Sequence, residues 1–69
     1  MIKCHLSRIM GERRFNIADL ARMTKINRGT ITRLYNEEAV RVELDVIDAL
    51  CKTLDISIDE LFEYIDDDV

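Results

Sequence analysis

The 69-residue sequence contains no proline and no tryptophan, and its only glycines are Gly11 and Gly29. Sheet folds with many hairpins need turn-forming residues at most chain reversals, so this shortage argues against them. Aromatic residues make up only 6% of the chain, so the core must come mainly from Ile, Leu, Val and Met. A chain of this length forms one small domain, and helices joined by short loops are its simplest architecture.

Several kinds of functional site are also missing. The two cysteines, Cys4 and Cys51, do not form a CxxC pair, which favours free thiols, although the sequence alone leaves a disulfide open. His5 stands alone, so we expect no metal and no cofactor. The sequence shows no nucleophile–base pattern, so we expect no enzyme. Without a signal peptide or a long apolar run, we expect a cytoplasmic protein with no membrane partner.

The charge is divided unevenly along the chain, although the net charge at pH 7 is only −4. Residues 1–41 carry nine basic and four acidic side chains, whereas residues 42–69 carry one basic and ten acidic side chains. A molecule polarised in this way can present a basic face to phosphates while its other end stays acidic. The net charge therefore does not exclude nucleic acid as a partner.

Hydrophobic spacing predicts five helices and no strand. The first covers Ile2–Arg13, and the second begins after Asn16, a good N-cap. Asn27 caps the third, which covers Arg28–Asn36, and the fourth covers Leu44–Leu54. In the last two of these helices we expect Tyr35 and Leu44, like their aliphatic neighbours, to face the core.

The fifth helix is predicted from a capping box, Ser57-Ile58-Asp59-Glu60, in which the glutamate reaches back to the start of the helix. Its apolar residues are Ile58, Leu61, Phe62 and Ile65. Beyond it, residues 66–69 are expected to form an acidic, disordered tail, which leaves residues 1–65 as the domain.

The second and third helices have the features of a helix-turn-helix. One α-helix fits the major groove of B-form DNA if the helix before it can brace it from behind. Ala21 is small enough for close contact between the two helices, and Ile26, Ile31 and Leu34 can anchor the joint. The outer face of the third helix is polar and slim: Asn27, Arg28, Gly29, Thr30, Thr32 and Arg33.

The stretch IADLARMTKINRGTITRLYN resembles the helix-turn-helix of the phage Cro/C1-type (Xre) repressor family. The stretch LDVIDALCKTLDISIDELF resembles the two closing helices of that family, so the resemblance covers nearly the whole chain. It implies an all-α, five-helix, lambda-repressor-like DNA-binding domain. Two positions depart from the family pattern: Ile17 replaces the usual glutamine, and Lys25 replaces the usual glycine of the joint. If Lys25 keeps a positive φ, the strain is on the order of 1 kcal/mol.

The resemblance also implies which residues contact DNA. Base edges would be met by Arg28, Gly29, Thr32 and Arg33, with Arg28 suited to guanine and Thr32 to a thymine methyl group. Phosphates would be contacted by Lys25, Asn27, Thr30, Asn36 and Arg41.

These features predict a sequence-specific regulator of transcription, a repressor, that binds double-stranded DNA as a homodimer. Phe62, Tyr64 and Ile65 on the last helix are candidates for the dimer interface, and packing against the first helix is their alternative role. Two other functions stay open: a protein-interaction module that no longer binds DNA, and the DNA-binding antitoxin of a toxin–antitoxin pair with a protein partner.

Overall fold

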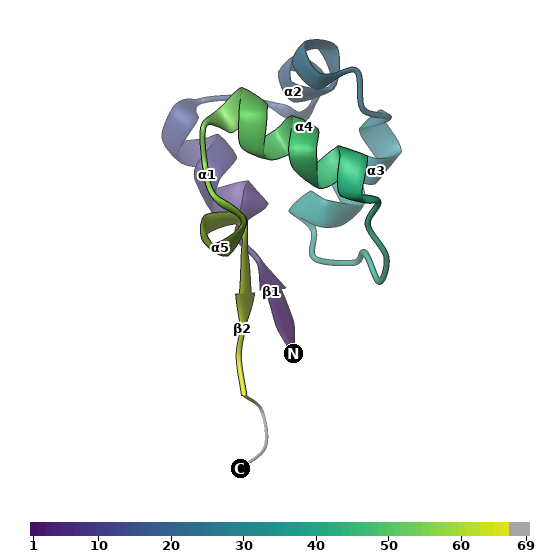
Figure 1. Cartoon of the computed structure of the whole chain (residues 1–69). Helices are drawn as coiled ribbons and strands as arrows, with labels where there is room; N and C mark the ends of the chain where they lie inside the picture. The colour runs from purple at the N-terminus through teal and green to yellow at the C-terminus, as the bar shows by residue number, and fades with distance from the viewer. Residues whose placement is uncertain (67–69) are drawn as a thin grey trace.

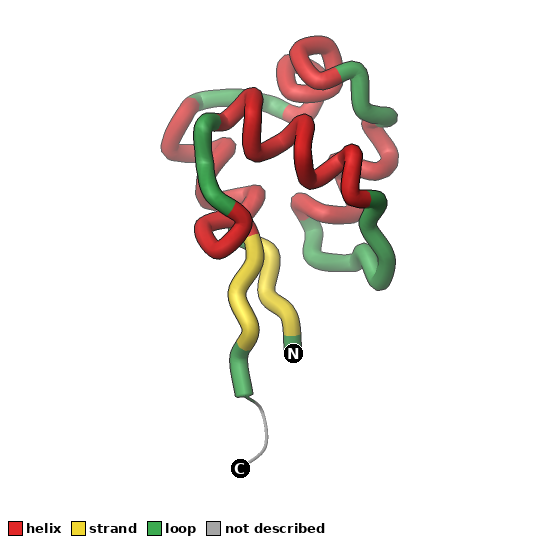
Figure 2. The backbone as a smooth tube through the Cα atoms, viewed as in Figure 1, coloured by secondary structure: helices red, strands yellow, loops and turns green. Residues whose placement is uncertain are grey.

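The computed structural model describes residues 1–66 and consists of a helical body from which a two-stranded sheet projects (Figure 1). Both strands leave the same end of the body, so the first residues of the chain and the last described ones lie side by side (Figure 2). The elements in chain order are β1 (Ile2–Cys4), α1 (Leu6–Arg13), α2 (Ile17–Thr24), α3 (Arg28–Tyr35), α4 (Leu44–Leu54), α5 (Ile58–Leu61) and β2 (Phe62–Tyr64).

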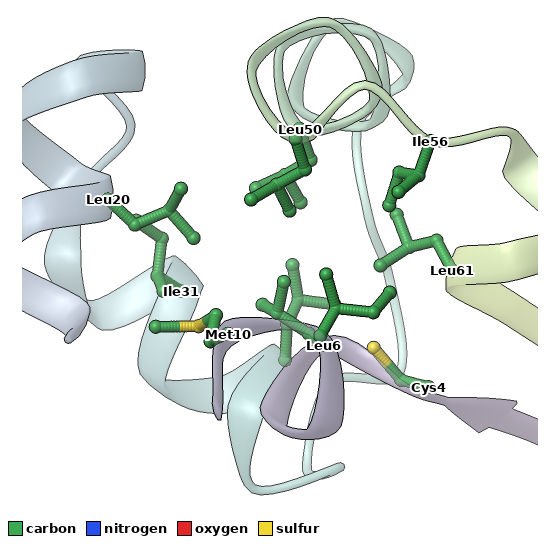
Figure 3. Packing of buried hydrophobic residues seen from close by; sticks show 11 residues of the cluster. Cys4, Leu6, Met10, Leu20, Ile31, Leu50, Ile56 and Leu61 are labelled. Carbon is green, nitrogen blue, oxygen red and sulfur yellow. The ribbon is translucent and has the colours of Figure 1, made fainter. Parts of the chain in front are cut away.

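The core is a single cluster to which all five helices contribute (Figure 3). Leu20 of α2, Ile31 of α3 and Leu50 of α4 have no solvent exposure. Because each helix places apolar side chains three or four residues apart, each presents one stripe to this shared interior. The remaining buried residues are Cys4, Leu6, Ile9, Met10, Leu34, Leu54, Ile56 and Leu61.

Helices α2 and α5 begin at the capping residues that the sequence predicts. Asn16 accepts a hydrogen bond from the amide of Asp19 at 2.7 Å, and the carboxylate of Asp19 accepts from the amide of Asn16. The capping box predicted at Ser57 is present, with the Glu60 carboxylate accepting from the Ser57 amide at 3.0 Å. Each pair satisfies amides that the first turn of a helix leaves without partners. The bounds predicted for α4, Leu44–Leu54, are confirmed.

The ends of the helices show what the shortage of glycine means for this backbone. Arg14, Lys25 and Asp55 are the C-caps of α1, α2 and α4, and all three have a positive φ of 54–62°. Glycine is the usual residue at such positions because it has no Cβ to clash. In addition, the guanidinium of Arg13 donates a hydrogen bond to the carbonyl of Leu54, which places a cation at the C-terminal end of α4.

The prediction of an all-α fold is wrong at both ends of the described chain. Ile2–Cys4 is not the first turn of a helix but strand β1, and it pairs antiparallel with β2. Phe62 and Tyr64 belong to β2, and Ile65 follows it, so the prediction that they lie on a C-terminal helix is also wrong. The helix α5 ends at Leu61, where the chain becomes extended because its next residues pair with β1.

Three smaller predictions have mixed outcomes. Tyr35 is 39% exposed and Leu44 is 82% exposed. The prediction that both residues face the core is therefore wrong. Cys4 and Cys51 are both free thiols, as favoured. Of the predicted acidic tail, Asp66 is exposed, and residues 67–69 lie outside the described part of the chain. Within residues 1–66, no helix has the length and apolarity that crossing a bilayer requires.

Candidate nucleic-acid interface

The joint between α2 and α3 is three residues long and tightly bonded. Lys25 adopts the left-handed conformation, with φ 62° and ψ 19°, and its amide donates to the carbonyl of Ala21 at 2.8 Å. The hydroxyl of Thr24 donates to the carbonyl of Leu20 at 2.7 Å and accepts from the amide of Ile26 at 3.2 Å. The joint therefore keeps the backbone shape that a glycine would give, at the cost of strain at Lys25.

The inner side of α3 is held by the core. Ile31 is fully buried and Leu34 is 3% exposed, while Ala21 and Ile26 are half-buried and pack against the same cluster. The four residues predicted to brace this helix therefore do so. Because α3 is fixed from behind, its opposite side faces solvent in a defined direction, as a helix that enters a groove must do.

The N-terminus of α3 is capped by Asn27, and Gly29 in its first turn has no side chain to cover the backbone. The side-chain oxygen of Asn27 accepts a hydrogen bond from the amide of Gly29 at 2.7 Å. A Cβ at position 29 would lie 3.0 Å from that oxygen and 3.6 Å from a guanidinium nitrogen of Arg33. Glycine therefore leaves room here for both the cap and the Arg33 head group.

Thr32 and Arg33 lie further along α3. The hydroxyl of Thr32 donates to the carbonyl of Arg28 at 2.8 Å, so its hydrogen is already used within the helix. Arg33 is exposed, and its guanidinium donates to the hydroxyl of Thr30 at 3.5 Å. The Arg33 side chain thus folds back toward the N-terminus of the helix, where Arg28 and Gly29 also lie.

Arg28 is exposed and borders an open hollow between α3 and the start of α2. The other residues that line this hollow include Phe15, Ile17 and Tyr35. Ile17 stands where the resembling family has glutamine, so this hollow has an apolar wall. The exposure of Tyr35 in it was not predicted from the sequence. The sequence does contain one indication of this exposure: Tyr35 lies seven residues after the exposed Arg28, and residues seven apart share a helix face.

The structure also places the predicted phosphate-contacting residues. Arg41 is exposed in the loop before α4 and borders a hollow together with Thr30 and Arg33. Lys25, Asn27 and Thr30 border another hollow. Asn36 is exposed at the C-cap of α3 and lies at the opposite end of the helix from Asn27. Seven of the nine predicted contact residues thus gather along α3 and its N-terminal joint, and Asn36 and Arg41 follow the helix.

Two carboxylates that the sequence analysis did not assign to this surface lie beside it. Glu43 and Asp45, at the start of α4, border the same hollow as Lys25 and Asn27. A carboxylate close to a phosphate path repels the backbone of DNA, so these residues limit where a duplex can approach.

The comparisons with known proteins agree with this geometry. The family model for the Cro/C1-type HTH DNA-binding domain matches residues 5–67, which include all of α1 to β2. No curated protein shows significant similarity to the chain. Since the match covers nearly the whole sequence, and α2, its joint and α3 have the geometry of the motif, the chain belongs to the Cro/C1-type helix-turn-helix family of DNA-binding domains.

Proposed function

We propose that this DNA-binding domain is a sequence-specific repressor that reads the major groove with α3. The observation that carries the proposal is the arrangement of Arg28 and Arg33. Both are exposed on the outer side of a helix whose inner side, at Ile31, is fully buried. Arginine can donate two hydrogen bonds to a guanine edge, and each good pair of this kind contributes about 1–3 kcal/mol of discrimination.

The neighbouring residues support a division of roles along the same helix. Gly29 offers close approach of the backbone, and Thr32 offers a methyl group because its hydroxyl hydrogen is bonded within the helix. Lys25, Asn27, Thr30, Asn36 and Arg41 fix the register by contacting phosphates, which carries no sequence information by itself.

A homodimer is part of the proposal. One reading helix covers only a few base pairs, and helix-turn-helix proteins reach useful affinity by placing two modules on half-sites one helical turn apart. A dimer of this kind represses when its site overlaps a promoter.

The proposal is tested by selecting duplexes from a random library with the intact chain. The dissociation constants of the selected and scrambled duplexes are then measured at several salt concentrations by fluorescence anisotropy. We expect log K to fall linearly with log salt for both duplexes, and the selected duplex to bind about 10³-fold or more tightly. A promoter that contains the selected site should be silenced in a reporter assay.

The other outcomes point elsewhere. Absence of salt-dependent binding to any duplex would indicate a protein-interaction module. Specific binding without silencing would exclude the repressor role. Co-purification with a small toxic protein encoded beside this chain would indicate an antitoxin.

A further inference from the structure

A hollow of about 220 Å³ lies between the two-stranded sheet and the loop that joins α3 to α4. This loop runs beside β1, where the Glu37 carboxylate accepts a hydrogen bond from the Cys4 amide (Figure 1). An apolar cavity of about 150 Å³ can hold one benzene ring. The hollow therefore has room for a single ring with a short substituent, which is the size of a small molecule.

The wall of this hollow is mainly apolar. Leu34 of α3 is 3% exposed and Phe62 of β2 is half-buried, and both line the hollow. Ile2 and Val40 also line it and are 64% and 94% exposed, so they lie at its opening. A concave, mostly apolar wall with a few polar groups is the usual form of a small-molecule site.

Two charged residues border the hollow, and they are not equally available to a ligand. The Glu37 carboxylate already accepts from the Cys4 amide at 3.2 Å. The Arg41 side chain is exposed and has no ion-pair partner among residues 1–66. Burial raises the pKa of the Cys4 thiol, so this group is uncharged at neutral pH. Arg41 is thus the available charge at the hollow, and its complement is an anion.

Arg41 also borders a second hollow, together with Thr30 and Arg33 of α3. Under the proposed function, Arg41 contacts a DNA phosphate. A guanidinium that pairs with a carboxylate through two hydrogen bonds forms a unit with no net charge, and such a unit attracts a phosphate much less than a free guanidinium does. A carboxylate bound in the first hollow would therefore compete with DNA for the same side chain.

We propose that this hollow binds a small carboxylate with an apolar body the size of a single ring, and that the ligand weakens DNA binding by pairing with Arg41. The apolar body packs against Leu34 and Phe62, and the carboxylate accepts hydrogen bonds from the guanidinium. The regulatory part rests on the proposed function, because it requires that Arg41 contact a phosphate. The binding part does not.

Binding is tested on the parent chain without DNA, by following the amide NMR signals during a titration with phenylacetate. We expect the amides of Cys4, Leu34 and Val42 to shift, with a dissociation constant of about 1 mM for a ligand of this size. Acetate lacks the ring and phenylacetamide lacks the charge, so each should bind about tenfold more weakly or less. Absence of shifts at about 10 mM phenylacetate would overturn the proposal. So would tighter binding of phenethylamine, a cation that only Glu37 could hold.

Three variants locate the ligand. Arg41→Gln should remove the preference for phenylacetate over phenylacetamide. Arg8→Gln is the matched control, because Arg8 is exposed on α1 and does not border the hollow, and it should keep the preference. Equal loss in both variants would show a general charge effect and contradict the proposal. Ala39→Leu places a larger side chain in the wall of the hollow and should abolish binding of both compounds. Unchanged affinity in a folded Ala39→Leu variant would overturn the assignment of the site.

DNA binding tests the regulatory part and separates it from the proposed function. Saturating phenylacetate should weaken duplex binding by the parent about tenfold in about 0.1 M salt, which is the contribution of one phosphate contact. Acetate at the same concentration controls for ionic strength. Because linkage is reciprocal, the duplex should weaken phenylacetate binding by the same factor.

Ala39→Leu should bind the duplex as the parent does and should not respond to phenylacetate. A ligand that binds the hollow without changing the affinity for DNA would overturn the regulatory part. Phenylacetate binding by a chain that binds no duplex would support the site and contradict the proposed function.

Discussion

The backbone amide of Cys4 donates a hydrogen bond to the carboxylate of Glu37, a residue 33 positions later in the turn after α3. Glu37 adopts a positive φ of 58°, so its backbone is bent sharply at this point. The contact ties strand β1 to the C-terminal end of α3. It therefore links the two-stranded sheet to the helix that we propose as the DNA reader.

Replacing Glu37 by alanine should destabilise the domain by about 1–2 kcal/mol, because the partly buried amide of Cys4 loses a charged acceptor. Urea unfolding followed by circular dichroism measures the change. The control is Glu38→Ala, which alters the adjacent exposed carboxylate and should leave the unfolding midpoint within about 0.5 kcal/mol of the parent. Equal effects of the two substitutions would mean that the Cys4–Glu37 contact contributes nothing specific.

Lys25→Gly should stabilise the domain by about 1 kcal/mol, since glycine removes the steric cost of the left-handed conformation in the joint. Lys25→Ala is the control, because alanine retains the Cβ and should give no gain. Both variants lose the charge that we propose contacts a phosphate, so both should bind DNA less tightly and with a smaller salt slope. Thermal unfolding and anisotropy measure the two effects separately.

Arg28→Ala and Arg41→Ala should affect DNA binding in different ways. Loss of a base contact at Arg28 should relax the preference at one position of the selected site and cost about 1–3 kcal/mol on that site. Loss of a phosphate contact at Arg41 should weaken all duplexes alike and reduce the salt slope by about 1. Repeating the duplex selection with each variant measures both. If both variants select the parent's sequences with the parent's affinity, the assignment of contacts is wrong.

The stability of the domain should depend on pH through Glu60. Hydrogen bonds from the amide and hydroxyl of Ser57 hold the pKa of Glu60 below its ordinary value. A lowered pKa in the folded state means that the stabilisation is complete above the ordinary pKa of a glutamate and is lost as pH falls through the folded value.

Glu60→Gln should therefore lower the urea midpoint near neutral pH and make little difference in strong acid. Glu12→Gln, an exposed substitution on α1, serves as the control for removing one negative charge. A constant difference between parent and Glu60→Gln across the whole pH range would contradict this account.

The helical part of the fold was predictable because its signals are local. Asn16, Asn27 and Ser57 each begin a helix where the sequence places a capping side chain, and the α4 stripe extends from Leu44 to Leu54 as its spacing indicates. The bracing residues Ala21 and Ile31 were also recognisable, since a helix-turn-helix needs small and apolar residues at those positions.

The strands were not predictable because their signal is not local. Ile2 has the spacing to Leu6 and Ile9 of a helical stripe, and nothing near it in the sequence indicates that its partner is Tyr64. Three-residue strands are also too short for alternation to be distinguished from chance. The exposure of Tyr35 and Leu44 depends on how the helices pack, which periodicity alone does not give.

The pairing of β1 with β2 has a consequence for how the chain acquires its structure during translation. During translation, β1 is synthesised before the helices α1–α5, whereas β2 is synthesised after them. The amine of Met1 and the carbonyl of Ile65 are 64 positions apart, so the sheet closes only after the helices have been synthesised. Contacts between distant parts of a sequence form slowly. The nascent helical body should therefore be compact, and able to present α3, before the sheet closes.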